Sequence, residues 1–324
     1  MLVATFVVFL AWFSMKFYMD TSNDSETEAY VGTLTTSVTH GTIAADARGH
    51  YTALAPYVLW PFTATLQRVT GAYAIRGFVF ARLFLGAVLN VAAYAWYRRI
   101  GLGWLTSLLG LILLSTSFAF AQLINGWELD KVIEPALFLL AGLAAWNRRY
   151  LALLGIAALA AANRETGLFI PLVALAGLAL EDGGLRSAIT RWPVWACVIV
   201  CAAEVVWFRL FVPTPTLATW LDLKLDRVVL VTGGMCLMPL LAVAWVHAAP
   251  AALRRLFYLV APAWVALVLA IDRLDQGALL LTPLALLFVP VTLTGIEQAI
   301  RPPRELAAPR AGDDARAPAG STGR

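Results

Sequence analysis

The stretch AALAAANRETGLFIPL, residues 157–172, places the polar run Asn163-Arg164-Glu165-Thr166 between an alanine-rich and a leucine-rich segment. Both flanking segments have the composition of membrane helix. A charged side chain at the centre of a bilayer costs about 2.5–3.5 kcal/mol on insertion scales, so ionisable residues at that depth are candidates for a functional site. An Arg-Glu pair in a turn near the lipid headgroups costs far less. The depth of this run therefore decides both the fold and the search for a site.

The composition of the whole chain is that of a polytopic membrane protein. Of its 324 residues 60% are hydrophobic and 14% are charged, whereas a soluble domain carries about 25% charged residues. The three cysteines all lie in apolar segments and are interpreted as packing residues. With only three histidines in the chain, a His-rich metal site is excluded. We expect an all-α fold, with one transmembrane domain over residues 1–299.

Apolar runs long enough to cross a bilayer recur along the chain. A helix needs about 20 such residues to span the hydrocarbon. We therefore expect about 8–10 membrane helices, including a broken hairpin at residues 150–180. Residues 51–66 contain Pro56 and Pro61 and are expected to form an interfacial or re-entrant segment. The candidate spans are 2–18, 77–97, 102–123, 132–146, 150–180, 192–212, 228–249, 256–271 and 277–297.

Pairs of arginines set the expected orientation. Arg98-Arg99, Arg148-Arg149 and Arg254-Arg255 flank candidate spans, and excess Lys and Arg mark the cytoplasmic side of a membrane protein. This pattern predicts a multi-pass protein of the cytoplasmic (inner) membrane with both termini in the cytoplasm. Residues 19–50 would then form an acidic outer loop. Residues 300–324, rich in Pro, Ala, Gly and Arg, would form a disordered cytoplasmic tail.

Residues 150–180 decide the topology. As one straight helix they would measure about 46 Å, against about 30 Å of hydrocarbon. A single crossing would also move every later arginine to the outer side. Two limbs, 150–162 and 167–180, keep those arginines in the cytoplasm, and Gly167 and Pro171 favour a break between them. We interpret the polar run as an outward-pointing turn whose Arg164 and Glu165 face a polar cavity. The alternative is a plain interfacial turn.

Carboxylates cluster in two of the expected outer loops. A carboxylate can take a proton from an attacking hydroxyl, and a fixed arginine can bind a phosphate and stabilise a leaving group. Together they suit transfer from a lipid-phosphate donor to an acceptor hydroxyl, although each acid alone can equally belong to a solvated loop. Isolated charges also occur within spans, where Arg209 is expected to extend toward the membrane surface. The first loop contains Asp20, Asp24, Glu26, Glu28, His40, Asp46 and His50, and the later loop contains Glu128, Asp130, Lys131 and Glu134.

Two stretches carry a resemblance to a known family. They are DSETEAYVGTLTTSVTHG (24–41) followed by HYTALAPYVLWPF (50–62), and the longer segment from INGWELDKVIEP to NRETGLFIPL (124–172). They resemble the GT-C-type integral-membrane glycosyltransferases that use polyprenyl-phosphate sugars, such as the lipid A aminoarabinose transferases and the protein O-mannosyltransferases. An adjacent Asp-Glu pair of that family is replaced here by Asp24-Ser25-Glu26, and the usual Lys near the break by Arg164-Glu165.

The resemblance implies roles for individual residues. Asp24 or Glu26 would be the general base, with Asp24 preferred and Asp20 as the reserve. Arg164 would contact the lipid phosphate, and Asp130 would match the acid of the later loop. The full set of substrate-binding candidates is Arg164, Glu165, Asn163, Asp130, Glu28, His50 and Tyr51.

The implied partners are a polyprenyl-phosphate sugar donor, a lipid or glycan acceptor and membrane lipids, with no nucleic acid. The sequence identifies no certain cofactor, and a divalent cation remains an open alternative because carboxylates bind such ions. Two other functions fit the same sequence. A transporter or flippase-like carrier would use the broken helix, but such proteins tend to show paired breaks in repeated halves. A noncatalytic membrane assembly protein would need neither Asp24 nor Arg164.

Overall fold

The computed structural model describes residues 6–12, 24–45, 51–70, 74–125, 129–181, 184–212, 238–270 and 282–300. Within these residues the chain is helical apart from one antiparallel pair of two-residue strands, β1 (Ala44–Ala45) and β2 (Tyr51–Thr52). The expected all-α fold is confirmed. Asp20, Asp46, His50 and the predicted tail after residue 300 lie outside the described residues.

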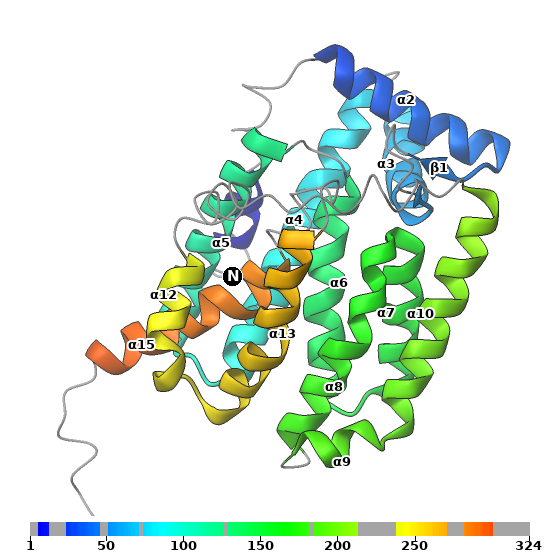
Figure 1. The fold of residues 1–324 in the computed structure, drawn as a ribbon. Helices are drawn as coiled ribbons and strands as arrows, with labels where there is room; N and C mark the ends of the chain where they lie inside the picture. The colour runs from blue at the N-terminus through cyan, green and yellow to red at the C-terminus, as the bar shows by residue number, and fades with distance from the viewer. Residues whose placement is uncertain are drawn as a thin grey trace, which may run out of the picture.

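The centre of the molecule is a bundle around α6 (Leu129–Trp146). This helix packs against α4 (Ala74–Arg99), α7 (Tyr150–Asn163) and α8 (Ile170–Glu181), and α10 (Trp192–Phe211) packs against α7 and α8. In Figure 1 the remaining helices lie above, to the left of and below this bundle, while α10 forms its right-hand edge. They are α2 (Asp24–His40), α3 (Leu54–Thr70), α5 (Trp104–Asn125), α9 (Leu185–Ile189), α12 (Met238–Trp245), η3 (Val246–Ala248), α13 (Ala251–Ala270), η4 (Leu284–Phe288) and α15 (Val289–Ile300).

The predicted break in residues 150–180 is present. Helix α7 ends at Asn163, Arg164 is extended with φ −161° and ψ 163°, and a 3₁₀ turn, η1 (Glu165–Phe169), leads into α8. The two limbs lie between α6 and α10 (Figure 1). Because α7 has 14 residues and α8 has 12, each limb is only about 20 Å long, which is shorter than a bilayer's hydrocarbon.

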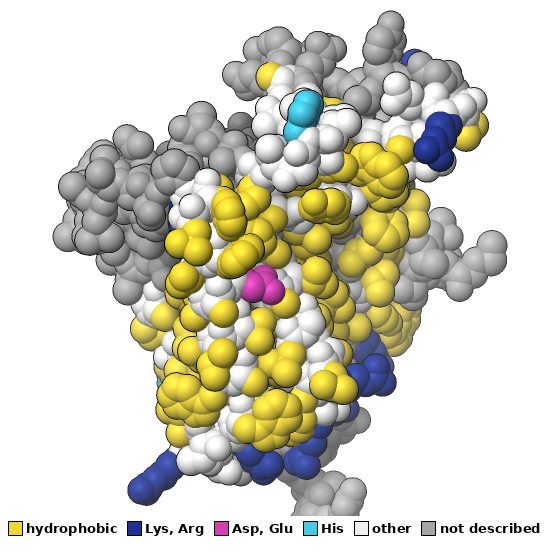
Figure 2. Space-filling model, turned by 90° about the vertical axis from the view of Figure 1, so that its right-hand side faces the viewer, with side chains coloured by type: hydrophobic (Ala, Val, Ile, Leu, Met, Phe, Trp, Pro, Cys, Tyr) yellow, Lys and Arg dark blue, Asp and Glu magenta, His cyan; other side chains and the backbone are white. Residues whose placement is uncertain are grey.

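Aromatic contacts gather the basic turns at one end of the bundle. Trp96 at the end of α4 packs on Trp146 at the end of α6, with ring centroids 5.7 Å apart, and the Arg99 guanidinium lies 5.5 Å from the Trp146 ring. Tyr150 at the start of α7 packs on Trp192 at the start of α10. Figure 2 shows most of the visible Lys and Arg side chains toward the lower end of a hydrophobic face.

The segment expected as an outer loop contains a helix. Residues 24–40 form α2, which ends at Gly41 with φ 63°. Its Thr and Ser hydroxyls, at positions 33, 35, 37 and 39, donate to carbonyl groups four residues earlier. These polar side chains therefore find partners within the helix, so the polar composition that suggested a loop is compatible with a helix.

The proline-containing segment 51–66 is also mostly helical. It contributes β2 and most of α3. Pro56 falls in the first turn, where a helix needs no backbone N–H from it. Pro61 lies in the interior of the helix, and one such interruption in 17 residues did not prevent α3 from forming.

Two of the described helices are long and apolar enough to cross a membrane, Arg76–Arg99 and Trp192–Phe211. Both meet this criterion by length and composition alone. Other apolar helices, among them Tyr150–Asn163 and Met238–Ala248, are shorter. Residues 6–12 are helical, with Ala11 packed against α4 at Gly86.

Gly167 provides a direct test of the broken hairpin. A Cβ at this position would lie 2.5 Å from the carbonyl carbon of Ala160 and from the amide nitrogen of Ala161. Because both are backbone atoms, they cannot move aside as a side chain would. We expect Gly167→Ala to destabilise the fold by about 3 kcal/mol, near the upper end for an overpacked site. Thermal unfolding of the detergent-purified protein measures the effect.

Gly155→Ala is the matched control. A Cβ on Gly155, in the α7 helix against which η1 packs, meets nothing within 4 Å. This variant should stabilise the helix by up to about 1 kcal/mol. Equal melting temperatures for the two variants would contradict the close packing of η1 on α7.

Candidate functional site

A buried ion pair joins the break to the start of α6. Arg164 Nη1 lies 3.1 Å from Asp130 Oδ2, and the two side chains are only 3% and 5% exposed. Because Arg164 is extended between α7 and η1, its backbone leaves the helical path at this point. Asp130 lies in the first turn of α6, where the helix dipole favours a carboxylate. The pair thus holds the break against the N-terminal end of α6.

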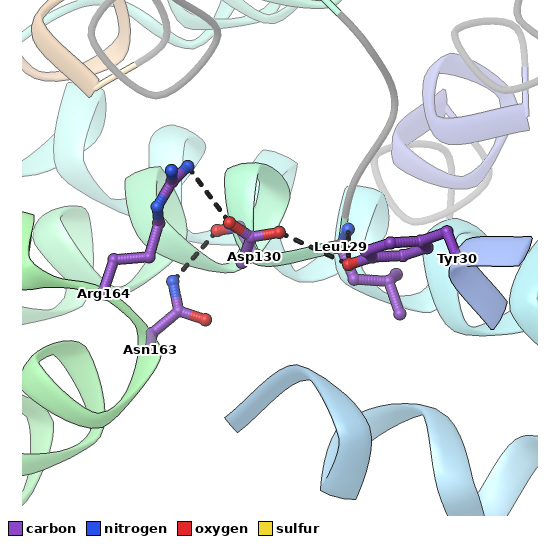
Figure 3. Close-up of polar contacts among 5 residues, drawn as sticks. All are labelled: Tyr30, Leu129, Asp130, Asn163 and Arg164. Atoms are coloured by element: carbon purple, nitrogen blue, oxygen red, sulfur yellow. Dashed lines mark hydrogen bonds and ion pairs between the residues drawn. The ribbon is translucent and has the colours of Figure 1, made fainter. Parts of the chain in front are cut away.

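Two further side chains complete the site around Asp130 (Figure 3). Asn163 Nδ2 donates to the Asp130 backbone carbonyl at 3.0 Å. The Tyr30 hydroxyl donates to Asp130 Oδ1 at 3.4 Å and accepts from the Leu129 amide at 3.1 Å. The Leu129 N–H is one of the helix-start donors that α6 cannot satisfy internally. Residues from α2, α6 and the hairpin therefore meet at one point.

A backbone hydrogen bond docks a fourth segment beside this site. The Ala53 amide donates to the Ala162 carbonyl at 3.0 Å. Residues 51–53, which are β2 and the single residue between β2 and α3, therefore lie against the last turn of α7. Tyr51, one of the predicted substrate-binding residues, belongs to this segment as the first residue of β2.

The helical spacing of α2 determines how the predicted acidic residues are placed relative to Tyr30. Asp24, Glu26 and Glu28 lie in the first turns of this helix, ahead of Tyr30. Positions four residues apart share a helix face. Glu26 is therefore placed on the face of Tyr30, the residue that reaches Asp130, whereas Asp24 is six residues away and is placed on another face. The helix favours Glu26 over the Asp24 that the sequence favoured.

The polar run does not open as a unit onto a cavity. Arg164 is buried and bonded to Asp130. Glu165 instead forms an ion pair with Arg209 of α10, and these two side chains are about 15% and 13% exposed. Arg209 was expected to extend toward the membrane surface, but it contacts the hairpin because α10 packs against η1. Arg164 and Glu165, although adjacent in the run, therefore form ion pairs with different helices of the described structure.

Three residues that lie in or near the site were not among the predicted catalytic or substrate-binding residues. Tyr30 bonds Asp130, Arg209 bonds Glu165, and Glu134 is 5% exposed one turn after Asp130 on α6. A helical reading of residues 24–40 would have placed Tyr30 one turn after Glu26. No sequence signal connects Arg209 to Glu165, because they are 44 residues apart.

The described residues contain no group of three or more His, Cys, Asp or Glu that could hold a metal ion. The chemistry that the site offers is therefore that of a fixed guanidinium and its hydrogen-bonded carboxylate. Asp130 engages one Nη group, and a guanidinium carries five N–H donors in a planar fork suited to phosphate or carboxylate.

Comparison with known proteins finds no match: no family model, no curated protein and no solved structure is similar to this chain. The description of the site therefore rests on its own geometry.

A double-mutant cycle tests the ion pair. Asp130→Asn leaves the Arg164 charge buried without its carboxylate, and breaking a buried pair costs about 3–5 kcal/mol. We expect the same range for Arg164→Gln. The double variant should recover a large part of this loss because no uncompensated charge remains. Unfolding free energies of the four proteins in detergent provide the coupling.

The pair Glu165–Arg209 serves as the comparison. Its side chains are more exposed than those of Asp130 and Arg164. Glu165→Gln should therefore cost less than Asp130→Asn. Strictly additive losses at Asp130 and Arg164 would show that the two side chains do not interact.

Proposed function

We propose that this chain is an integral-membrane glycosyltransferase of the GT-C type. It would move a sugar from a polyprenyl-phosphate donor to an acceptor hydroxyl at the outer face of the cytoplasmic membrane. The observation that carries the proposal is the Arg164 guanidinium, held by Asp130 at a helix break and connected through Tyr30 to a helix that begins with three acids. This arrangement supports phosphate binding next to a source of general base.

In the proposed reaction Arg164 binds the donor phosphate. The phosphate competes with Asp130 for the N–H donors of the guanidinium, and Asp130 keeps that group in place. As the bond between the sugar C1 and the phosphate oxygen breaks, the electron pair stays on the phosphate, where the arginine stabilises it. The acceptor oxygen forms the new bond to C1, and its proton passes to a carboxylate of α2.

Glu26 is the preferred base in this mechanism, with Asp24 as the alternative, since Glu26 shares the Tyr30 face of α2. Tyr30 positions the start of α6 through its bonds to Leu129 and Asp130. Glu165 and Asn163 act on the shape of the break, through Arg209 and the Asp130 carbonyl respectively.

The membrane arrangement belongs to the same proposal. The helices of the bundle would cross the bilayer with their arginine-rich turns in the cytoplasm. The break would then lie within the depth of the membrane near its outer side. Non-helical backbone is tolerated there only when protein buries it or when it lines a cavity, and Arg164 and Thr166 are buried.

Cysteine labelling in intact cells tests the orientation. Cys197 and Cys201 are buried, so a Cys236→Ala background leaves little native reactivity. We expect Thr33→Cys, exposed on α2, to react with a membrane-impermeant maleimide added outside. Ser187→Cys, exposed on α9, should react only after the cells are opened. The reverse pattern would place the site in the cytoplasm and contradict the proposed donor side.

A transfer assay tests the activity. Membranes containing wild type, Glu26→Gln, Asp24→Asn or Arg164→Gln would receive a panel of radiolabelled polyprenyl-phosphate sugars at matched expression. We expect the loss of Arg164 or of the base to lower transfer at least about 100-fold, as for general-base removal. Asp24→Asn should lower it less than Glu26→Gln. Arg98→Lys is the control and should keep wild-type transfer. Arg98 lies in the last turn of α4, at the end of the bundle away from Arg164.

The double variant Asp130→Asn/Arg164→Gln separates folding from catalysis. It should regain stability but not transfer, because the phosphate-binding cation is gone. Transfer that survives Arg164→Gln, Glu26→Gln and Asp24→Asn would contradict this site. Wild-type membranes that transfer none of the offered sugars would favour a carrier or an assembly protein.

A further inference from the structure

A single acidic residue interrupts the apolar sequence of α10. The helix has 20 residues, and Glu204 is its only Asp or Glu. Only 17% of its most apolar stretch is buried within the molecule, compared with 50% for Arg76–Arg99. Figure 2 shows the side of the molecule on which α10 lies in Figure 1, and an acidic side chain appears there within a mainly hydrophobic face. The outer surface of α10 is therefore left for lipid or another protein to cover.

Glu204 lies far from either end of this helix. At 1.5 Å per residue it is about 18 Å from Trp192 and about 10 Å from Phe211. In the membrane arrangement proposed above, α10 crosses the bilayer, so this carboxylate lies within the hydrocarbon. Long Lys and Arg side chains can extend to the membrane surface from such a depth, but a glutamate is too short to do so.

The described part of the chain offers Glu204 no bonded partner. Its side chain is partly exposed, and it forms no hydrogen bond or ion pair with any described residue. The cation of the same helix, Arg209, lies five residues later and bonds Glu165 of the hairpin. The nearby thiol of Cys201 is buried and lies 3.7 Å from the Ala157 carbonyl oxygen.

Lipid alone would leave this carboxylate without a partner. Acyl chains can cover the exposed apolar side chains of α10, such as Trp195, Ile199 and Val206, but they carry no hydrogen-bond donor. A carboxylate in an apolar environment is costly unless it is paired. Ionisable side chains within membranes accordingly pair with one another or with other polar groups. The missing group is therefore a donor that reaches the depth of Glu204.

The surroundings of Glu204 restrict what can supply that donor. The occupant must cover apolar side chains along the helix, and a protein segment in the hydrocarbon satisfies its own backbone as a helix. It must also bring a cation, because a Lys or Arg both donates to a carboxylate and neutralises its charge. A second copy of this chain, packed through α10 about a two-fold axis, would instead bring two Glu204 carboxylates together. Like charges disfavour that arrangement.

We propose that the outer face of α10 binds a membrane-spanning helix of another protein that carries a Lys or Arg at the depth of Glu204. Trp207 and Phe211 follow Glu204 at helical spacing and are exposed, so apolar side chains of the partner pack against them. The inference rests on the membrane crossing of α10 in the proposed arrangement. It does not rest on sugar transfer, and the binding is measured without any sugar donor.

Energy transfer in liposomes tests the charge pairing. The full-length protein would carry a donor dye at Ser187→Cys, which is exposed on α9, in the Cys236→Ala background. It would be reconstituted in zwitterionic lipid with acceptor-labelled Leu-Ala peptides of about 20 residues, which span the bilayer. The peptides differ only in a central Lys, Leu or Glu. We expect the Lys peptide to reach half-maximal transfer at a peptide concentration at least fivefold lower than the Leu peptide, and the Glu peptide to bind no better than the Leu peptide.

Substitutions at Glu204 test its role. Glu204→Gln keeps the side-chain shape and should abolish the preference for the Lys peptide. Its unfolding temperature in detergent should match wild type, because no described residue bonds the carboxylate. Glu204→Lys should reverse the preference, with the Glu peptide binding at least fivefold better than the Lys peptide. Glu297→Gln is the control and should keep the wild-type preference, since Glu297 lies on α15 and accepts from the Gly103 amide.

Three results would overturn the proposal. Equal transfer to the Lys and Leu peptides would show that the face needs no cation. A preference for the Lys peptide that survives Glu204→Gln would place the attraction elsewhere. Energy transfer between donor-labelled and acceptor-labelled copies of the protein, lost in Glu204→Gln, would identify a second copy as the occupant. The reversal expected for Glu204→Lys keeps the test decisive if Glu204→Gln fails to fold.

Discussion

The buried contact between Arg164 and Asp130 is the interaction on which the rest of the structure depends. Two opposite charges, nearly removed from solvent, must stay together because separating them leaves either one uncompensated. One partner lies at a helix break and the other at a helix start. The contact therefore fixes the position of the hairpin along the axis of α6. It also places Asn163 at the backbone carbonyl of Asp130 and Tyr30 at its carboxylate.

The hairpin was predictable from the sequence because length and charge both required it. Residues 150–180 were too long for one crossing, and a single crossing would have reversed the side of every later arginine. The bounds of α7 and α8 agree with that reasoning to within a few residues. The 3₁₀ turn between them was not predictable, because it depends on Gly167 fitting against the backbone of Ala160.

The parts of the site that the sequence missed are those that need three-dimensional contacts. Asp24 was preferred as the base because it stands next to the first span, and that argument treated residues 19–50 as a loop. Once they form α2, helical periodicity determines which acid shares a face with Tyr30. The partnership of Glu165 with Arg209 depends on how α10 packs against the hairpin. Neither periodicity nor charge counting contains that information.

Two carboxylates of α6, one helical turn apart, lie in different surroundings. Asp130 is paired with a cation, and Glu134, four residues later, lines a mainly apolar cavity among α6, α8 and α13. One turn of helix rises about 5.4 Å, so the carboxylate that pairs with Arg164 and the carboxylate at the cavity are close neighbours on α6. The helix whose first turn anchors the break therefore also forms part of the cavity wall, and a change in how α6 packs against the hairpin would act on both.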